Sequence, residues 1–236
     1  MTASSTSDRA LVVMAKAPRP GTVKTRLAQS LPLPAVIELY RCLLDDTVAL
    51  AKSLDGVNVS IMCPASDVDD LARATNHGVR IVGQTGEGLA AGLTSVFAQL
   101  KEAGQGRIIA FNSDSPHLPA SVLTSAFEAL ATCDVVVGPT HDGGYYLVGA
   151  KVSHPGLFQG DGLGTTNAFE ALLARARALG LSVCLTEPFY DIDVAPDLTQ
   201  LAAELRLAPD RAPRTAVWLK EWAQTVALLR TSTTEL

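Results

Sequence analysis

The sequence lacks the features that mark several classes of protein. No stretch of its 236 residues approaches the roughly 18 uninterrupted apolar residues of a membrane-spanning helix. The apolar run near the N-terminus is too short for a signal peptide. The formal net charge of −5 argues against general nucleic-acid binding, which favours basic faces. We therefore expect a cytoplasmic protein that binds neither membranes nor nucleic acids.

Closely spaced cysteines are also missing. The chain has four cysteines that form no Cys-x-x-Cys pair and lie far apart in the sequence: Cys42, Cys63, Cys133 and Cys184. Three of them fall within or at the edge of apolar, strand-like segments. We therefore expect buried free thiols and a reducing compartment.

Short β-branched segments alternate with longer stretches rich in alanine and leucine. Strands are predicted at residues 10–15, 57–63, 79–83, 107–111, 134–138, 145–150 and 181–185. Helices are predicted at residues 34–54, 66–75, 88–103, 119–131, 165–179 and 196–207. This alternation predicts a Rossmann-like three-layer α/β/α fold with a mostly parallel sheet. We expect one domain over residues 9–230, between a disordered tail at residues 1–8 and a C-terminal tail at residues 231–236.

Acidic residues are absent from residues 9–37, although five cations lie in this interval. Most of them belong to KAPRPGTVKTRL, which follows the first predicted strand and needs a negative partner. We expect Thr22 to cap a helix whose N–H groups attract an anion beside Lys24 and Arg26. The predicted phosphate-binding residues are Lys16, Ala17, Pro18, Gly21, Thr22, Lys24 and Arg26. A solvated basic turn is the alternative, and the spacing of a Walker loop is absent.

Acidic residues follow two other predicted segments. Asp114, in RIIAFNSDSPHLP, comes just after an apolar strand, where a carboxylate can hold a hard divalent cation. Asp191 and Asp193 flank Ile192, and a strand would point both carboxylates to the same side. One of these two could supply a second ligand beside Asp114. The alternative for Asp114 is the cap of the next helix.

Two further stretches carry weaker signals. In HDGGYYLVG, Gly143 and Gly144 permit close backbone approach, and Asp142 could contact ligand hydroxyls next to Tyr145. A plain hairpin turn explains these residues equally well. Gln84 follows a predicted strand, so its amide could read the edge of a nucleobase. The nearby segment GEGLAAG does not match the dinucleotide-binding fingerprint.

Five motifs, taken in order, resemble those of a known family: KAPRPGTVKTRL, NSDSPHLP, DGGYYLVG, LGTTNAFEALLARARALGLSV and DIDVAPDL. They resemble an uncharacterised bacterial family with the nucleotide-diphospho-sugar transferase fold, labelled selenium-domain-associated transferases or glycosyltransferases. The resemblance covers about residues 10–205. More distantly, the chain is similar to the 2-phospholactate guanylyltransferases, which share Lys-Thr-Arg-Leu after the first strand.

The resemblance implies a seven-stranded mixed sheet of GT-A type in which the strand at 145–150 is antiparallel. It implies a nucleotide cradled by the first loop and a divalent metal, Mg²⁺ or Mn²⁺, held by Asp114 and by Asp193 in preference to Asp191. The segments GEGL and LGT differ from the Gly-Asp-Leu-Gly and Trp-Ser-Thr of relatives. With the resemblance, Gln84 and Gly88 join the predicted nucleotide-binding residues. The predicted acceptor-side residues are Asp142, Gly143, Gly144, Tyr145, Thr165 and Thr166.

Nucleotidyl transfer and glycosyl transfer can both use such a scaffold. Sugar-transferring relatives usually show Asp-x-Asp at the strand end, whereas Asp114-Ser115-Pro116 resembles nucleotidyltransferases. We expect a transferase that joins the nucleotide of a nucleoside triphosphate to a small phosphorylated acceptor and releases pyrophosphate. Its catalytic residues would be Lys24, Arg26 and Asp114. The alternatives are a glycosyltransferase that uses a nucleotide sugar and a non-catalytic nucleotide-binding domain.

Overall fold

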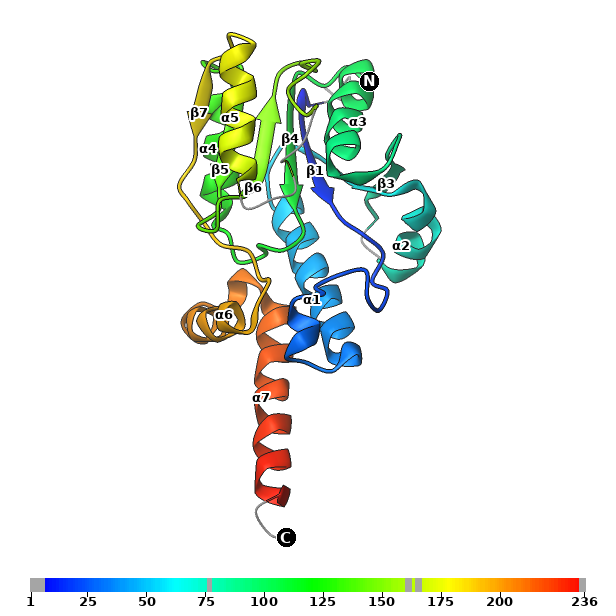
Figure 1. Ribbon diagram of the computed structural model, residues 1–236, viewed down its shortest axis with the longest axis vertical. Helices are drawn as coiled ribbons and strands as arrows, with labels where there is room; N and C mark the ends of the chain where they lie inside the picture. The colour runs from blue at the N-terminus through cyan, green and yellow to red at the C-terminus, as the bar shows by residue number, and fades with distance from the viewer. Residues whose placement is uncertain (1–6, 76–77, 160–162, 164–166, 234–236) are drawn as a thin grey trace, which may run out of the picture.

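A seven-stranded sheet forms the centre of the molecule in the computed structural model (Figure 1). The structure describes residues 7–75, 78–159, 163 and 167–233. The strands are β1 (Arg9–Met14), β2 (Asn58–Cys63), β3 (Arg80–Gly83), β4 (Arg107–Asn112), β5 (Val135–Pro139), β6 (Tyr145–Ala150) and β7 (Val183–Leu185). Their order across the sheet is β3-β2-β1-β4-β6-β5-β7. All seven predicted strands are confirmed, with ends that differ by at most two residues.

The direction of β6 makes the sheet mixed. β6 pairs antiparallel with β4 and with β5, whereas the other neighbouring strands pair in parallel. The tight turn between β5 and β6 explains this reversal, because a parallel connection would need a crossover of a dozen or more residues. The expectation of a mostly parallel sheet with an antiparallel strand at 145–150 is confirmed.

Helices cover both faces of the sheet, as the near-continuous apolar strands require. Leu11 and Val13 of β1 point to the face covered by α1 (Leu33–Lys52), α2 (Val68–Ala74) and α4 (Ala120–Ala129). Val12 points to the opposite face, which α3 (Gly88–Glu102) and α5 (Ala168–Ala178) cover. The alternation follows from the two-residue period of a strand and confirms the three-layer α/β/α architecture.

A second helical cluster lies beyond one end of the sheet. It consists of α6 (Ala195–Leu207), α7 (Pro213–Thr233) and part of α1 (Figure 1). Leu39 of α1, Leu201 of α6 and Trp218 of α7 are buried together there. Asp46 of α1 accepts hydrogen bonds from the backbone N–H and the hydroxyl of Thr215, and so holds the first turn of α7.

The six predicted helices are present, but α7 was not predicted. Its last residue is Thr233, so the helix extends into the segment that the sequence suggested was a tail. Residues 1–6 and 234–236 of the predicted tails lie outside the described residues. In the part of the chain that the structure describes there are also three short 3₁₀ helices: η1 (Leu27–Gln29), η2 (Ala65–Asp67) and η3 (Pro209–Arg211). Among the described helices, none is both long and apolar enough to span a membrane.

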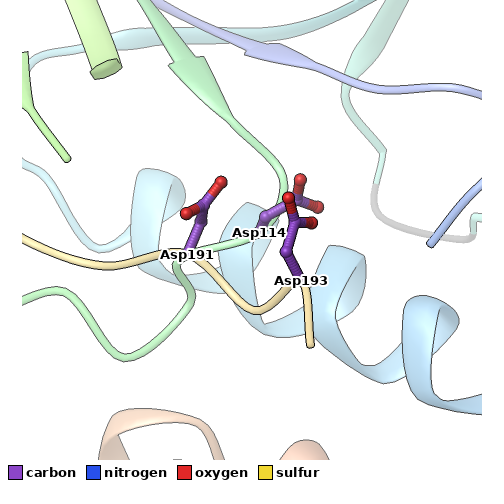
Figure 2. Close-up of side chains that lie close together, drawn as sticks. All are labelled: Asp114, Asp191 and Asp193. Carbon is purple, nitrogen blue, oxygen red and sulfur yellow. The ribbon is translucent and has the colours of Figure 1, made fainter. Parts of the chain in front are cut away.

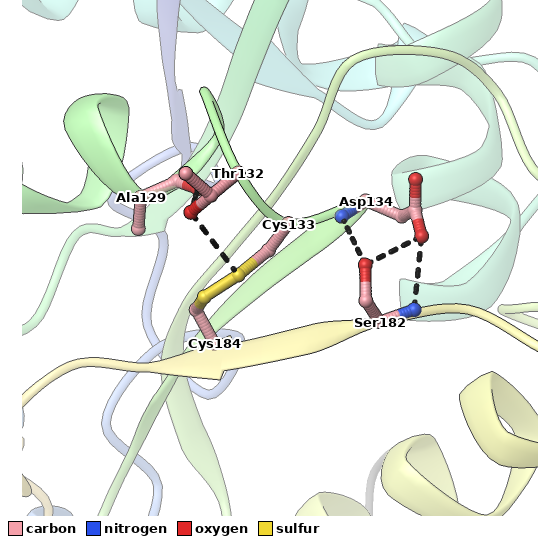
Figure 3. Close-up of a disulfide and its surroundings, with 6 residues drawn as sticks. All are labelled: Ala129, Thr132, Cys133, Asp134, Ser182 and Cys184. Atoms are coloured by element: carbon pink, nitrogen blue, oxygen red, sulfur yellow. Dashed lines mark hydrogen bonds between the residues drawn. A yellow bond between two sulfur atoms is a disulfide. The ribbon is translucent and has the colours of Figure 1, made fainter.

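A disulfide joins the strands at one edge of the sheet. Cys133, just before β5, is bonded to Cys184 of β7, with 6.0 Å between their Cα atoms (Figure 3). Next to the disulfide, Ser182 donates its hydroxyl and its backbone N–H to the carboxylate of Asp134. The expectation of free thiols is wrong for this pair, because two distant segments meet as parallel neighbours. Cys42 and Cys63 are free. The inference of a reducing compartment loses the support it drew from unpaired cysteines.

Candidate active site

The site lies where the adjacent strands β1 and β4 end. These strands are parallel, and Met14 at the end of β1 pairs with Asn112 at the end of β4. The segments that follow them therefore leave the sheet at the same edge, which is where open α/β sheets bind ligands. The basic stretch after β1 and the acidic Asp114 after β4 meet for this reason.

Internal carboxylates neutralise part of the basic stretch. The guanidinium of Arg19 donates hydrogen bonds to Asp67 at 2.7 Å and to Asp70 at 2.7 Å. The backbone N–H of Ala17 also donates to Asp67, at 2.7 Å. The negative partner that the charge pattern required is thus supplied in part by the chain itself. Lys16 is exposed and forms no ion pair with the residues that the structure describes.

No helix begins beside Thr22, so the expected helix cap is wrong. The hydroxyl of Thr22 donates instead to the carbonyl of Arg19, at 2.8 Å. Lys24 has a φ of 48°, in the left-handed region that residues other than glycine rarely adopt, and this conformation interrupts any helix through the segment. The first helical turn after it is η1, which begins at Leu27.

Lys24 turns inward toward two carboxylates. Its ammonium lies 2.9 Å from Oδ2 of Asp114 and 3.0 Å from Oδ1 of Asp193, and its side chain is 3% exposed. Arg26 is mostly exposed and reaches the other oxygen of Asp193 at 3.5 Å. Burial alone would lower the pKa of Lys24, but the charges of Asp114 and Asp193 outweigh it and raise the pKa above its usual value. Lys24 is therefore a protonated, buried cation.

Three carboxylates converge beside Lys24. Figure 2 shows Asp114 on the segment that follows β4, and Asp191 and Asp193 on the linker that leads into α6. One oxygen of each lies within 4.8 Å of the others. The linker is irregular rather than a strand, yet it points both acids to the cluster because Ile192 between them is buried against the second helical cluster. We refer to Asp114, Asp191 and Asp193 as the carboxylate cluster.

Backbone hydrogen bonds fix the linker against the end of β4. The N–H of Ile192 donates to the carbonyl of Asp114 at 3.1 Å, and the hydroxyl of Ser115 donates to the carbonyl of Tyr190 at 3.1 Å. Asp197 of α6 accepts from the backbone N–H groups of Asp193 and Val194, as expected for an acid in a first helical turn. The linker that carries Asp191 and Asp193 is thus held through its main-chain groups from both sides.

Burial and nearby negative charge both act on the pKa of Asp191. Burial of its carboxyl, together with the charges of Asp193, Asp114 and Asp142, raises the pKa to about 6, although Lys24 acts in the opposite direction. A carboxyl with a raised pKa keeps its proton to a higher pH than an ordinary aspartate does. A bound cation would relieve the part of this shift that comes from repulsion between the carboxylates.

A cavity of about 950 Å³ opens beside the cluster. It extends from the segment after β1 to the loop between β3 and α3. The predicted site residues that line it are Lys16, Thr22, Lys24, Gln84, Gly88, Asp114 and Asp193. The predicted residues that do not line it are Ala17, Pro18, Gly21, Arg26, Asp142, Gly143, Gly144, Tyr145 and Asp191. Thr165 and Thr166 lie outside the described residues.

Gln84 is mainly bonded to its own loop. Its side-chain amide donates to the carbonyl of Gly86 at 3.0 Å and to that of Gly88 at 3.2 Å. Both glycines have positive φ, near 80°, so the turn depends on residues without a Cβ. The side-chain amide of Gln84, which could read a base edge, thus stabilises the turn that forms this wall of the cavity.

The predicted acceptor-side residues form the turn between β5 and β6. Asp142 accepts hydrogen bonds from the hydroxyl of Thr140 at 2.6 Å and from the N–H of Gly144 at 3.3 Å, as in a hairpin turn. The turn lies against the linker, because His141 donates its N–H to the carbonyl of Phe189 at 3.1 Å. The charge of Asp142 in this turn therefore acts on Asp191 and contributes to its raised pKa. The acceptor role of these residues stays a prediction.

Two positioning residues were missed by the sequence reasoning. The hydroxyl of Tyr40 in α1 donates to the carbonyl of Lys16 and accepts from its N–H, both at 3.1 Å, and lies 3.4 Å from the hydroxyl of Ser113. Tyr40 thus connects the segments after β1 and β4. Asp67 anchors the basic stretch from the other side. Neither residue belongs to a recognisable motif, and only their placement in space reveals them.

The protein-family model described as "Uncharacterized protein conserved in bacteria (DUF2064)" matches residues 47–165. The chain belongs to this family. The matched part of this DUF2064 protein contains Asp114, whereas Lys24, Asp191 and Asp193 lie outside it. The comparison with curated proteins finds no match.

Solved structures share the fold of this DUF2064 protein. A candidate nucleotide-diphospho-sugar transferase from Desulfovibrio desulfuricans G20 is 25% identical, with a TM-score of 0.85, and the match covers 95% of this chain and 98% of that one. A 4-diphosphocytidyl-2C-methyl-D-erythritol synthase from Anaerococcus prevotii DSM 20548 is 12% identical, with a TM-score of 0.53 over 84% and 97% of the two chains. A CMP:2-keto-3-deoxy-manno-octonic acid synthetase complexed with CTP is 10% identical, with a TM-score of 0.53 over 85% and 99%. The predicted nucleotide-diphospho-sugar transferase fold is confirmed.

Proposed function

We propose that this DUF2064 protein is a transferase that takes its donor group from an activated nucleotide. The reaction we favour joins the nucleotide of a nucleoside triphosphate to a small phosphorylated acceptor and releases pyrophosphate, with Mg²⁺ or Mn²⁺ as cofactor. An oxygen of the acceptor phosphate attacks the α-phosphorus, a new P–O bond forms, and the bond between this phosphorus and the α,β-bridging oxygen breaks.

One observation carries the proposal: the cavity wall brings basic and acidic groups together at the end of the sheet. Lys16 and Lys24 line the cavity together with Asp114 and Asp193. Cations beside carboxylates suit a polyphosphate that arrives with a divalent metal, since each member then has an oppositely charged partner. The volume of about 950 Å³ is large enough for a nucleotide and is at the upper end of ordinary ligand sites. The relative from Desulfovibrio desulfuricans G20, named for nucleotide-diphospho-sugars, supports the same ligand class.

The carboxylate cluster fits a hard divalent metal. Its three groups offer only oxygen atoms, and these lie within 4.8 Å of one another. Asp114 and Asp193 would be the ligands that also face the cavity, with Asp191 behind them. When bound, the metal would neutralise charge on the phosphate groups of the donor.

The cations of the basic stretch have separate tasks. Lys24 places a positive charge at the carboxylate cluster, from which its ammonium can reach a phosphate oxygen. Arg26 is mostly exposed, and its guanidinium can donate to a leaving pyrophosphate. A single donor aimed at charge that develops in the transition state is worth about 3 kcal/mol. The glycines around Gln84 let the nucleotide approach the backbone of the opposite wall.

The test is incubation with labelled nucleoside triphosphates, a pool of phosphorylated metabolites and Mg²⁺ or Mn²⁺. We expect pyrophosphate release that depends on both the metal and the pool, and its loss in Asp114→Asn. Asp210→Asn, which changes an exposed carboxylate in η3, is the matched control and should remain active.

A glycosyltransferase is the second candidate, favoured by the nucleotide-diphospho-sugar relative. In the same assay it would release a nucleoside diphosphate from a nucleotide sugar and leave triphosphates intact. Binding of nucleotides without consumption of any donor would instead indicate a non-catalytic nucleotide-binding domain and would exclude both reactions.

A further inference from the structure

Lys24 holds a position that is unusual for a phosphate-binding lysine. Its ammonium forms ion pairs with Asp114 and Asp193, at 2.9 and 3.0 Å. The side chain is 3% exposed, and the backbone reaches this position through a φ of 48°. A strained backbone at a functional site persists only where the surroundings hold it in place. Here the two ion pairs do so.

The carboxylate oxygens that hold Lys24 belong to the same cluster that fits a divalent metal. Asp114 contributes Oδ2 and Asp193 contributes Oδ1 to the ion pairs. Arg26 approaches the remaining oxygen of Asp193, at 3.5 Å. Among the described residues, Asp191 forms no ion pair. The ammonium therefore occupies the side of the cluster that faces the cavity, where a metal shared with a nucleotide would have to bind.

We propose that the ammonium of Lys24 is the resident counter-ion of the carboxylate cluster and competes with a divalent cation for Asp114 and Asp193. The inference rests on the proposed function, which assigns a metal to this cluster. Two positive ions cannot share these oxygens at close range without strong repulsion. Metal binding thus requires that Lys24 leave its ion pairs.

A nucleotide provides the place to which Lys24 moves. Lys24 lines the cavity, so a phosphate group bound there offers its ammonium a new negative partner next to the cluster. A metal that binds alone displaces Lys24 and leaves its ammonium without a negative partner. A metal–nucleotide complex supplies the metal to Asp114 and Asp193 and a phosphate to Lys24 at the same time. Metal and nucleotide therefore bind cooperatively, and by linkage each raises the affinity of the other by the same factor.

The first experiment measures Mn²⁺ binding without nucleotide, by titration calorimetry and by the loss of the free-ion EPR signal. Lys24→Met removes the ammonium and keeps the length of the side chain. We expect it to bind Mn²⁺ at least tenfold more tightly than the wild type. Arg26→Met is the matched control, because its charge lies near the same Asp193 but is mostly exposed, and it should change the affinity less than threefold. Equal affinity in wild type and Lys24→Met, or no Mn²⁺ binding by a folded Lys24→Met, would overturn the inference.

The second experiment uses the wild type alone and covers the case in which Lys24→Met does not fold. Lysines are acetylated at pH 8.5 with and without saturating Mn²⁺, and the modified peptides are quantified by mass spectrometry. We expect Mn²⁺ to raise the labelling of Lys24 at least fivefold, while the exposed Lys16 stays within twofold. Saturation by Mn²⁺ with Lys24 still protected would disprove the displacement.

A third measurement separates this inference from the proposed function. A non-hydrolysable triphosphate analogue is titrated into the wild type with and without Mn²⁺, and we expect each ligand to tighten the other at least tenfold. Tight, metal-dependent binding of the analogue without any release of Lys24 would leave the proposed function intact and remove only the counter-ion role. Failure of every nucleotide to bind would remove the proposed function, and the Mn²⁺ titrations would still decide the competition.

Discussion

The carboxylate of Asp191 should destabilise the metal-free protein at neutral pH, and Asp191→Asn should remove this effect. Burial and the charges of Asp193, Asp114 and Asp142 raise its pKa from an ordinary 3.8 to about 6. Each pH unit of such a difference corresponds to about 1.4 kcal/mol between the protonation states. With allowance for the partial exposure of the side chain, ionised Asp191 costs about 2–3 kcal/mol of unfolding free energy.

The sign of the pH dependence follows from the raised pKa. Below pH 4, Asp191 is protonated in both the native and the unfolded protein, so it contributes no difference. Between pH 4 and 6 the unfolded chain loses the proton first, and the native state becomes progressively less stable as the pH rises. Above pH 6 the penalty has its full value. Asp191→Asn, which has no charge at any pH, should therefore show its stabilising effect mainly above pH 6.

The assay is thermal unfolding in EDTA at pH 4 and at pH 8. We expect Asp191→Asn to raise Tm by roughly 5–10 °C at pH 8 relative to the wild type, given about 2–4 °C per kcal/mol for a chain of this size. At pH 4 the difference should be much smaller, and the exposed control Asp210→Asn should show little effect at either pH. Equal effects of Asp191→Asn at the two pH values would refute the reasoning, because the stabilisation would then not arise from the charge.

Three further predictions concern other contacts. Cys184→Ser should lower the free energy of unfolding by about 2–4 kcal/mol, because the disulfide closes a loop with a sequence separation of 51. In denaturant unfolding, a reductant should lower the wild type to the same free energy, and a wild type that does not respond to the reductant would contradict this prediction. Tyr40→Phe should lower stability by about 1–2 kcal/mol, since it leaves the partly buried backbone N–H and carbonyl of Lys16 without their partner. Nucleotide affinity, measured by calorimetry, should fall as well, and an unchanged affinity would contradict the positioning role of Tyr40. Arg26→Ala should weaken triphosphate binding at least tenfold at low salt with an unchanged Tm, whereas unaltered affinity would remove Arg26 from the phosphate site.

The sequence was sufficient for the fold because the relevant signals are local. Runs such as the one at Leu11–Val13 are apolar on both faces, and this pattern belongs to strands of a covered parallel sheet. The position of Asp114 directly after a strand then placed it at the ligand-binding edge. The same rule applied to the stretch that follows β1, so the meeting of Lys24 with Asp114 was predictable in outline.

The partners of the charges were not predictable, because they depend on which loops face each other. Arg19 binds Asp67 and Asp70, which lie 48 and 51 residues further along the chain. Lys24 bonds to Asp193, which is separated from it by 169 residues. No pattern in the sequence distinguishes the lysine that turns inward from the lysine at position 16 that stays exposed. The disulfide was missed for the same reason, since its two cysteines become neighbours only when β5 and β7 pair.

The carboxylate cluster is built from two parts of the fold, the sheet and the linker from β7 to α6. Asp114 belongs to the sheet, whereas Asp191 and Asp193 precede a helix that packs on α7 and on the first half of α1. A small rotation of this helical layer would therefore open or tighten the cluster without moving a single strand. Substitutions between α6, α7 and the first half of α1, outside the cavity, can in this way alter the affinity of the cluster for a cation.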